Sequence, residues 1–355
     1  MQALVANRAL LSRTANLLTN HSFGAGLKSS TIPVPTLATN EILVKISATS
    51  LNAIDAKFVD FIAPSGSILG CDFAGTVADA GSSSWRKGDR VAGFVQGGIS
   101  SDVGAFADYV KADADLVWRV PESVKDEEAA TYGIVAVTAM QALKLHLGVW
   151  WSQDTKKEPT GVEKVLLVYS GATGVGLFAI QMAKRAGWTV VTTASPRSFD
   201  LVKRYGADHV FDYRTPSAAQ DIKKKFPSIS RALDCISIGE STKFCGQVVS
   251  GNTNAKIITL LDSKTKAPGV EVKMIMSFQM LGKEFAWLPP IGPKYPVSKE
   301  DRDALVQFYA ELGAIAGEVK SPPVTMLDGG FDGIIKGLDK LRKGAVSGSK
   351  LVVKY

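Results

Sequence analysis

The fold of this chain is decided by residues 165–214, which read VLLVYSGATGVGLFAIQMAKRAGWTVVTTASPRSFDLVKRYGADHVFDYR. They open with five apolar residues, Val165–Tyr169, a run that is too short for a helix and predicts a buried strand. Apolar positions then recur at helical spacing from Val175 until Gly187, and a second strand is expected over 188–193. Strand and helix are joined by a short turn rich in glycine, namely Gly171, Gly174 and Gly176.

A strand, a glycine-rich turn, a helix and a second strand form a βαβ unit, and its turn is suited to phosphate. Backbone N–H groups and the positive end of the helix dipole face the same point there. The turn departs from G-x-G-x-x-G, because Thr173 stands at the second glycine position and Gly174 follows it. We predict a dinucleotide site formed by Ser170, Gly171, Ala172, Thr173, Gly174, Val175 and Gly176. A glycine-rich connection with a purely structural role is the alternative.

The end of the second strand indicates which dinucleotide binds. An NAD site needs an acidic residue there for the ribose 2′-hydroxyl. This chain instead offers hydroxyl groups and a guanidinium, which suit a 2′-phosphate, and Asp200 comes too late in the chain. We therefore predict NADPH, bound by Ser195, Pro196, Arg197 and Ser198. In the structural alternative, Ser195 is a helix cap and Arg197 a solvated helix residue.

Length and composition narrow the class of protein. A chain of 355 residues should hold two domains, and no apolar run reaches membrane-spanning length. The three cysteines lie far apart and form no metal or redox motif, which favours a reducing compartment. The net charge of +7 reflects either simple solubility or an acidic partner such as a carrier protein. Nucleic acid is not expected, because no dense basic tract is present.

The first 40 residues contain no acidic residue, which is typical of a mitochondrial transit peptide. Against this, Gln2–Ala6 already predicts a strand. We expect a cytoplasmic location, with the mitochondrion as the alternative.

The remaining chain divides into a β-rich part and an alternating part. Strands are expected over 42–46, 75–77, 90–93, 104–110 and 117–121, followed by helical patterning over 122–147 and a polar connection over 150–161. Strands at 209–212, 231–237 and 255–261 then alternate with helices at 218–226 and 242–249, which predicts an α/β fold with a parallel sheet. The last elements expected are helices at 301–312 and 331–341 and strands at 324–327 and 350–354, whereas 270–297 is left unassigned.

Several stretches together resemble the medium-chain dehydrogenase/reductase superfamily. They are Leu51–Asp55, Ile68–Val77, Lys87–Val91, Gly104–Val110, Ala129–Thr131 with Thr138-Ala139, and 165–214. The resemblance is greatest to its zinc-free branch, which contains quinone oxidoreductases and the fungal trans-acting enoyl reductases of polyketide biosynthesis, a part of secondary metabolism. The likeness to the enoyl reductases rests on Cys71–Gly75, Ser195–Leu201, Phe211–Arg214 and Val346–Gly348 before Lys350–Val352.

This resemblance implies a Rossmann domain inserted into a GroES-like catalytic domain. The expected domains are 1–122 and 291–355, which form the catalytic domain, and 123–290, which binds NADPH. No metal is expected. Zinc-dependent relatives carry Cys where this chain has Asn52, and Gly-His-Glu where it has Gly70-Cys71-Asp72.

The resemblance also implies reduction of a C=C bond conjugated to a carbonyl group. Hydride passes from the nicotinamide to the β-carbon, the enolate oxygen gathers charge, and the α-carbon is protonated. Asn52, Asp55 and Lys57 would lie beside the nicotinamide, with Lys57 and Thr138 as candidate donors. In the structural alternatives, Lys57 is only a solvated helix residue, and the Thr138 hydroxyl donates to a backbone carbonyl of its own helix. Further cofactor contacts are expected from Tyr213, Leu260, Leu261, Val346 and Ser347.

We predict an NADPH-dependent enoyl reductase that acts on polyketide acyl thioesters, either small or bound to a carrier protein, with a polyketide synthase as a possible partner. Residues 276–290 would line the pocket or serve domain packing. The alternatives are a general quinone or enone (alkenal) reductase and a non-catalytic NADPH-binding protein. A monomer and a homodimer are both compatible with the sequence. His21, His146 and His209 show no pairing that would support a hydrolase.

Overall fold

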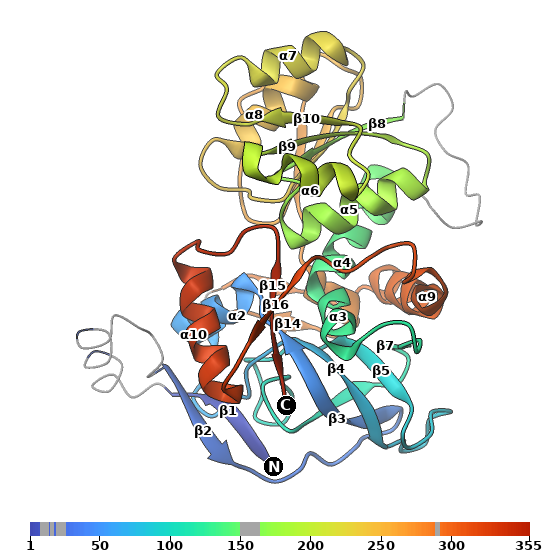
Figure 1. Cartoon of the computed structure of the whole chain (residues 1–355), viewed down its shortest axis with the longest axis vertical. Helices are drawn as coiled ribbons and strands as arrows, with labels where there is room; N and C mark the ends of the chain where they lie inside the picture. The colour runs from blue at the N-terminus through green and yellow to red at the C-terminus, as the bar shows by residue number, and fades with distance from the viewer. Residues whose placement is uncertain (8–13, 15–17, 19–25, 150–163, 288–291) are drawn as a thin grey trace. The chain divides into compact units, whose positions relative to one another are not determined.

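A computed structural model describes residues 1–7, 14, 18, 26–149, 164–287 and 292–355 (Figure 1). These residues form two compact units, of which the first combines Met1–Ile134 with Phe278–Tyr355 and the second is Val135–Ser277. The connection expected over 150–161, part of the basic N-terminal stretch and the end of the 276–290 segment lie outside the described residues.

The second unit is built on a six-stranded parallel sheet with the order β10-β9-β8-β11-β12-β13. This is the doubly wound order, which reverses direction between β8 and β11. The predicted α/β class is thereby confirmed. The strands are β8 (Val165–Tyr169), β9 (Thr189–Ala194), β10 (His209–Asp212), β11 (Arg231–Asp234), β12 (Lys256–Thr259) and β13 (Glu271–Met274).

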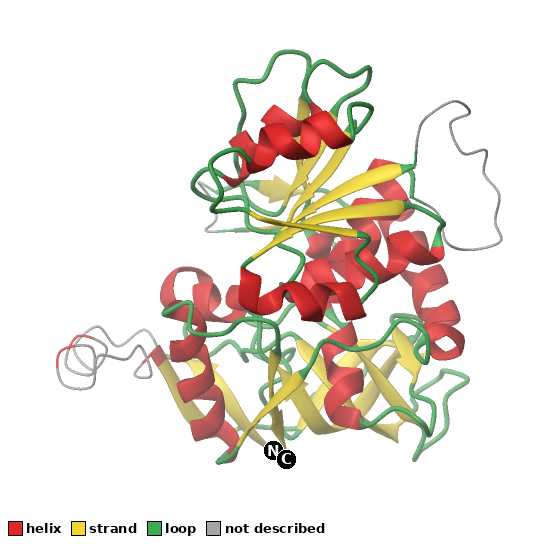
Figure 2. Ribbon diagram, turned by 45° about the horizontal axis from the view of Figure 1, so that its top comes forward, coloured by secondary structure: helices red, strands yellow, loops and turns green. Residues whose placement is uncertain are grey.

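Helices cover this sheet, and α7 and α8 share one face of it. Side chains from Leu167, Val191, Ala232 and Ile257 form a buried core there with residues of α7 and α8. Because side chains alternate along a strand, Leu166, Val168 and Val190 point to the other face, which is also buried. Figure 2 shows the strands in yellow between red helices. The α-helices that alternate with these strands are α5 (Gly174–Arg185), α6 (Phe199–Arg204), α7 (Ala218–Lys225) and α8 (Ser241–Val249).

The first unit contains a seven-stranded sheet to which both ends of the chain contribute. Its order is β16-β17-β3-β4-β5-β7, with β6 paired to β3. The C-terminal β17 is antiparallel to β3, with Val352 opposite Ser50. The strands are β3 (Glu41–Ser50), β4 (Asp72–Asp79), β5 (Arg90–Phe94), β6 (Tyr109–Asp113), β7 (Val117–Arg119), β16 (Val324–Leu327) and β17 (Lys350–Lys354).

Smaller elements surround this sheet. The hairpins β1 with β2 and β14 with β15 are antiparallel pairs. No helix in the described ranges is both long and apolar enough to span a membrane. Other elements of the unit include β1 (Gln2–Ala6), β2 (Leu27–Thr31), α2 (Ala53–Lys57), η2 (Phe58–Ile62), β14 (Phe285–Ala286), β15 (Lys294–Tyr295), α9 (Lys299–Ile315) and α10 (Gly330–Arg342).

The helical patterning expected over 122–147 corresponds to four consecutive helical pieces. The segment forms α3 (Asp126–Ala129), η3 (Ala130–Tyr132), α4 (Ile134–Met140) and η4 (Gln141–Leu147). It breaks at Gly133, where a Cβ atom would overlap the Asp72 carboxylate. The N–H of Ile134 donates to Asp72 Oδ1 at 2.8 Å, so a buried carboxylate takes the place of a helical acceptor.

Two β assignments also differ from the prediction. The strand expected over 104–110 begins only at Tyr109, because the N–H groups of Ala105 and Phe106 donate to carbonyl oxygens of Gly70 and Leu69. The sixth parallel strand, β13, falls in the segment that the sequence left unassigned. As an edge strand it alternates exposed and half-buried residues, so it lacks the apolar run of the central strands.

Two buried tyrosines of the first unit allow a test of this packing. The hydroxyl of Tyr132 donates to the carbonyl oxygen of Val319 at 2.7 Å, whereas the hydroxyl of Tyr309 has no partner among the described residues. Tyr132→Phe should lower the free energy of unfolding by about 1–2 kcal/mol, because a buried acceptor loses its donor. Tyr309→Phe, the matched control, should leave it nearly unchanged. Urea denaturation measures both, and equal losses would contradict the hydrogen-bond assignment.

Candidate active site: a dinucleotide edge and a buried polar cluster

The turn between β8 and α5 presents free backbone donors. Ser170 adopts a left-handed conformation (φ 61°), and its N–H donates to Thr193 Oγ1 at 2.9 Å. Thr173 caps α5 by accepting from the N–H of Gly176 at 3.0 Å. The N–H groups of Gly174 and Val175, the first two of the helix, have no acceptor among the described residues. The turn therefore fits the diphosphate of a dinucleotide.

Two glycines of this turn are required by close packing. A Cβ at Gly176 would lie 2.7 Å from Gly171 Cα and 2.7 Å from Ser170 O, so the helix can approach the turn only with glycine there. A Cβ at Gly171 would overlap Thr192 Oγ1. Gly174 is less constrained, since its nearest neighbour would be a side-chain atom of Val135 at 3.2 Å.

The segment after β9 leaves a guanidinium unpaired. Ser195 begins the short helix η5 (Pro196–Ser198), and its carbonyl accepts from Ser198 N at 2.8 Å. Arg197 is exposed and forms no ion pair with the described residues, while Ser198 is buried. The carboxylate on the neighbouring strand end, Asp212, bonds Arg214 at 2.8 Å, and this hydrogen bond lowers the pKa of Asp212. Asp212, the acidic residue of β10, is thus already paired with the guanidinium of Arg214.

A buried carboxylate orders the loops that follow β11 and β12. Asp234 accepts from the N–H groups of Ile236 and Ser237 at 3.0 and 2.9 Å and from the hydroxyls of Ser241 and Thr242 at 2.8 Å each. Ser237 Oγ in turn accepts from Leu260 N at 2.8 Å. This network was not predicted from the sequence. An Asp at a strand end followed by Ser and Ser-Thr was the available signal.

The other predicted cofactor contacts of this unit lie at the same strand ends. Tyr213 is 40 % exposed and packs against Tyr169, with ring centroids 6.2 Å apart. Leu260 and Leu261 follow β12 and are half-buried.

In the first unit, three segments that are distant in sequence, 50–52, Ile134 and Lys350, meet at the carboxylate of Asp72. Its Oδ2 accepts from Ser50 Oγ and Asn52 Nδ2 at 2.8 Å each and lies 3.5 Å from Lys350 Nζ. Lys350 Nζ also donates to Asn52 Oδ1 at 2.5 Å and to the carbonyl oxygen of Leu51 at 2.9 Å. All of these side chains are buried.

Asp55, in helix α2, adds a second carboxyl group to this cluster. Its Oδ2 accepts from the N–H of Asn52 at 2.7 Å, while its buried Oδ1 meets no partner among the described residues by hydrogen-bond geometry. Burial, followed by the charge of Asp72, raises the pKa of Asp55 to about 7, although hydrogen bonds from Asn52 N–H and the Cys71 thiol oppose the rise. Burial also lowers the pKa of Lys350, against the opposing charges of Asp72 and Asp55.

Comparison with known proteins places the chain in a family. Residues 38–122 match the alcohol dehydrogenase GroES-like domain, and residues 174–279 match the zinc-binding dehydrogenase family. The trans-enoyl reductase mpsG of Macrophomina phaseolina is 38 % identical over 335 residues, covering 90 % of this chain and 92 % of that protein. The trans-enoyl reductase caaB of Aspergillus niger is 35 % identical, covering 90 % and 91 %.

This chain belongs to the trans-enoyl reductases. Solved structures share the fold of this medium-chain dehydrogenase/reductase. A mycobacterial protein complexed with NADPH has a TM-score of 0.73 at 20 % identity, covering 100 % of both chains. The CurK enoyl reductase has a TM-score of 0.73 at 17 % identity, covering 99 % of each. We assign a nicotinamide cofactor to this family member, because the turn after β8 fits its diphosphate.

The zinc named in one matching family does not fit the residues of this enoyl reductase. The amide of Asn52 donates to Asp72 and accepts from Lys350, so neither end is available to a metal. The ammonium group of Lys350 also lies within the cluster. A tetrahedral zinc site instead needs thiolate, imidazole or carboxylate ligands with an open position. In the ranges that the structure describes, no group of three or more His, Cys, Asp or Glu could hold a metal.

The remaining predicted site residues are divided between the two units. Lys57 ends α2 and is half-buried, and burial lowers its pKa. Val346 is half-buried and Ser347 exposed, both in the loop before β17 of the first unit. Thr138 lies in α4 of the second unit and is buried. The catalytic and cofactor roles of these residues stay predictions.

The pH dependence of stability tests the cluster. Because the folded state raises the pKa of Asp55, it binds more protons than the unfolded chain between the usual carboxyl pKa and about 7. Protonated Asp55 therefore favours the folded state at low pH. As the pH rises from 5 to 8, the free energy of unfolding should fall by roughly 2–3 kcal/mol. Asp55→Asn keeps an acceptor for Asn52 N–H and should abolish that fall. Urea denaturation at both pH values measures it, with exposed Asp332→Asn as a control that follows the unmodified protein.

Proposed function

We propose that this protein uses NADPH to reduce the C=C bond of α,β-unsaturated acyl thioesters, acting in trans on intermediates held by a polyketide synthase. The observation that carries the proposal is the identity of 38 % to a trans-enoyl reductase over 90 % of the chain. The turn after β8, which fits a diphosphate, and the polar cluster around Asp72, whose residues do not fit zinc, support it. We also propose a cytoplasmic location.

NADPH rather than NADH is supported by the residues beyond β9. Arg197 offers an exposed guanidinium without an ion pair among the described residues, and Ser195 and Ser198 add hydroxyl groups. A guanidinium binds a phosphate through charge and paired donors, whereas the 2′-hydroxyl of NADH would give it no anionic partner. Asp212 is paired with Arg214, so its carboxylate does not neutralise the positive charge of Arg197.

When bound, the cofactor supplies the hydride that reaches the β-carbon. The protein then has to orient the thioester and stabilise the negative charge that develops on its carbonyl oxygen. We propose Lys57 and Thr138 as donors to that oxygen. Burial lowers the pKa of Lys57, so its ammonium gives up a proton more readily than an exposed lysine would. Asn52 and Asp55 hold the start of the short helix α2 that carries Lys57.

Quinone reduction is the second candidate, because the quinone oxidoreductase of Coxiella burnetii shares the fold with a TM-score of 0.67 at 23 % identity, covering 100 % and 99 %. Steady-state oxidation of NADPH with a short enoyl thioester and with a simple quinone separates the two functions. Turnover of the quinone alone would reject the enoyl reductase.

Lys57 is expected to matter for the chemical step. Lys57→Met should lower kcat on the enoyl thioester by about 100-fold, since it removes a donor but keeps the aliphatic length. The dissociation constant of NADPH should stay close to that of the unmodified protein. Lys343→Met, at an exposed lysine of the same unit, is the control. An unchanged kcat for Lys57→Met would remove Lys57 from the mechanism.

The choice of cofactor rests on Arg197. Arg197→Ala should raise the KM for NADPH by about 10- to 100-fold, as expected for the loss of a charge-assisted contact, and leave the KM for NADH almost unchanged. Arg204→Ala, an exposed arginine of α6, should change neither value. Equal effects of Arg197→Ala on both cofactors would contradict a 2′-phosphate site.

A further inference from the structure

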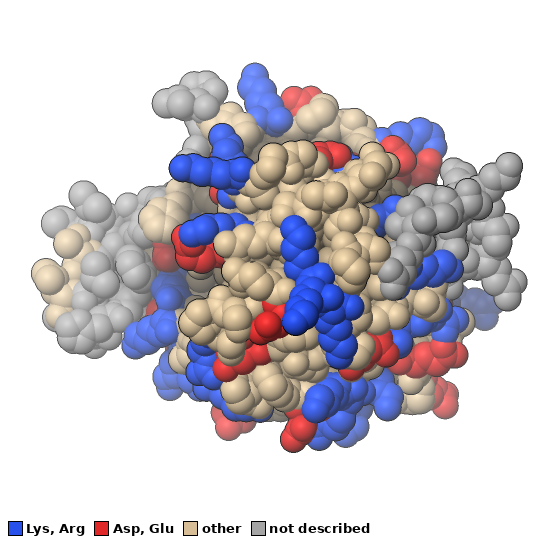
Figure 3. Space-filling view, turned by 90° about the horizontal axis from the view of Figure 1, so that it is seen from above, with Lys and Arg blue, Asp and Glu red and all other residues tan. Residues whose placement is uncertain are grey.

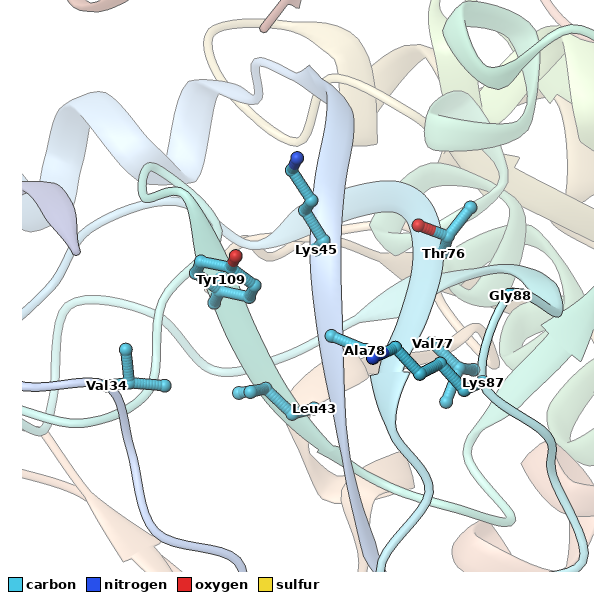
Figure 4. A pocket seen from close by; sticks show the side chains of 9 residues that line it. All are labelled: Val34, Leu43, Lys45, Thr76, Val77, Ala78, Lys87, Gly88 and Tyr109. Carbon is cyan, nitrogen blue, oxygen red and sulfur yellow. The ribbon is translucent and has the colours of Figure 1, made fainter.

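A groove of about 510 Å³ opens on the sheet of the first unit (Figure 4). Strands β3, β4 and β6, the turn before β5 and the segment before β3 line it. Its volume lies within the range of ligand-binding pockets. None of its lining residues belongs to the dinucleotide edge or to the Asp72 cluster, so the proposed reaction leaves it unused.

The pairing of three strands explains the shape of the groove. Lys45 lies opposite Thr76 on β4 and opposite Tyr109 on β6, so these three side chains stand in one row on the same face. Leu43, two residues earlier on β3, shares that face. The β3–β4 register shifts between Leu43 and Val44, which places Ala78 in a bulge where its small side chain leaves space.

Two positive charges of the groove are uncompensated. Lys45 and Lys87 are exposed. The ammonium group of neither forms an ion pair or a hydrogen bond with the described part of the chain. A neighbouring lysine, Lys111, is by contrast paired with Asp102 at 2.8 Å and with Glu41 at 3.6 Å. Asp79 is the acidic residue next to the bulge, and its carboxylate accepts from Gly81 N–H at 2.9 Å.

The groove also has an apolar side. Leu43 is half-buried and Val34 is 45 % exposed, a high value for a large apolar side chain. Figure 4 shows Lys45, Thr76 and Tyr109 along one side of the groove, with Leu43 and Val34 along the other. The site therefore combines two cations and two hydroxyl groups with apolar surface.

We propose that this groove binds an acidic segment, bearing an apolar side chain, of the protein that presents the thioester substrate. The proposal rests on the proposed function, because an enzyme that acts in trans must dock on the carrier of its substrate. The net charge of +7 would speed the encounter with an acidic partner.

The composition of the groove favours a protein segment over other anions. A free phosphate would leave Leu43 and Val34 uncovered, whereas an acidic segment with one apolar side chain satisfies both sides of the groove. A nucleic acid would require a longer basic stripe. Figure 3, a view of one face of the molecule from above, shows Lys and Arg side chains with Asp and Glu side chains among them.

The test compares one acyl group on two carriers. Reduction of an enoyl group is measured on a carrier domain of the synthase and on a small thiol, N-acetylcysteamine. Lys45→Glu with Lys87→Glu should lower kcat/KM for the carrier-bound substrate by about 10-fold or more, because two attractive contacts become repulsive. The kcat/KM for the small thioester should not change. Lys224→Glu with Lys340→Glu makes the same change of charge at exposed lysines outside the groove that form no ion pair with the described residues, and it should leave both values near those of the unmodified protein.

A second variant separates docking from damage to the fold. Val34→Asp places a carboxylate at the exposed apolar side without altering either lysine, and it should show the same selective loss. An undiminished rate on the carrier-bound substrate in both groove variants would overturn the proposal, as would equal losses on the two substrates.

Binding distinguishes a failure of this proposal from a failure of the proposed function. If the unmodified protein reduced neither thioester, the proposed function would fail. The groove would then be judged by fluorescence anisotropy of the labelled carrier domain. Weaker binding to the Lys45→Glu, Lys87→Glu protein than to the Lys224→Glu, Lys340→Glu protein supports the groove, and equal binding overturns it.

Discussion

The first unit depends on the hydrogen bonds and the ion pair that one buried carboxylate, that of Asp72, requires. An isolated charge in a protein interior is strongly unfavourable unless it is paired and hydrogen-bonded. Asp72 receives a hydroxyl from Ser50, an amide from Asn52, the backbone N–H of Ile134 and the charge of Lys350. The end of β3, the start of α2, the start of α4 and the C-terminal strand β17 are therefore fixed at one point.

This arrangement has a consequence for the chemistry of the cluster. Two carboxyl groups, Asp55 and Asp72, share a buried region with the single ammonium group of Lys350. Burial and the charge of Asp72 raise the pKa of Asp55, so a proton is retained there near neutral pH. The residues around Asp72 bond to one another rather than offer a set of metal ligands, so the proposed reaction is assigned to hydrogen-bond donors.

In the second unit, a buried carboxylate likewise orders the loops at the carboxyl ends of the parallel strands. Asp234, at the end of β11, is buried and accepts four hydrogen bonds from the loop and helix that follow it. Through Ser237 it also orders Leu260 after β12. Because the strand order reverses between β8 and β11, the loop held by Asp234 follows the strand next to the glycine-rich turn. A rigid edge of this kind suits a ligand that must be held in one orientation.

The sequence by itself determined the features that depend on neighbouring residues. The β8 strand, the start of α5 after the glycine-rich turn and the absence of an acid after β9 are all local, so periodicity, glycine spacing and side-chain chemistry were sufficient to predict them. The tertiary structure alone decided the break at Gly133, the edge strand β13, and the roles of Lys350 and Asp234. Lys350 lies 298 positions from Asn52 in the chain, and Gly133 is required because Asp72 approaches it. Contacts of that kind arise from the packing of distant segments, and no local pattern carries them.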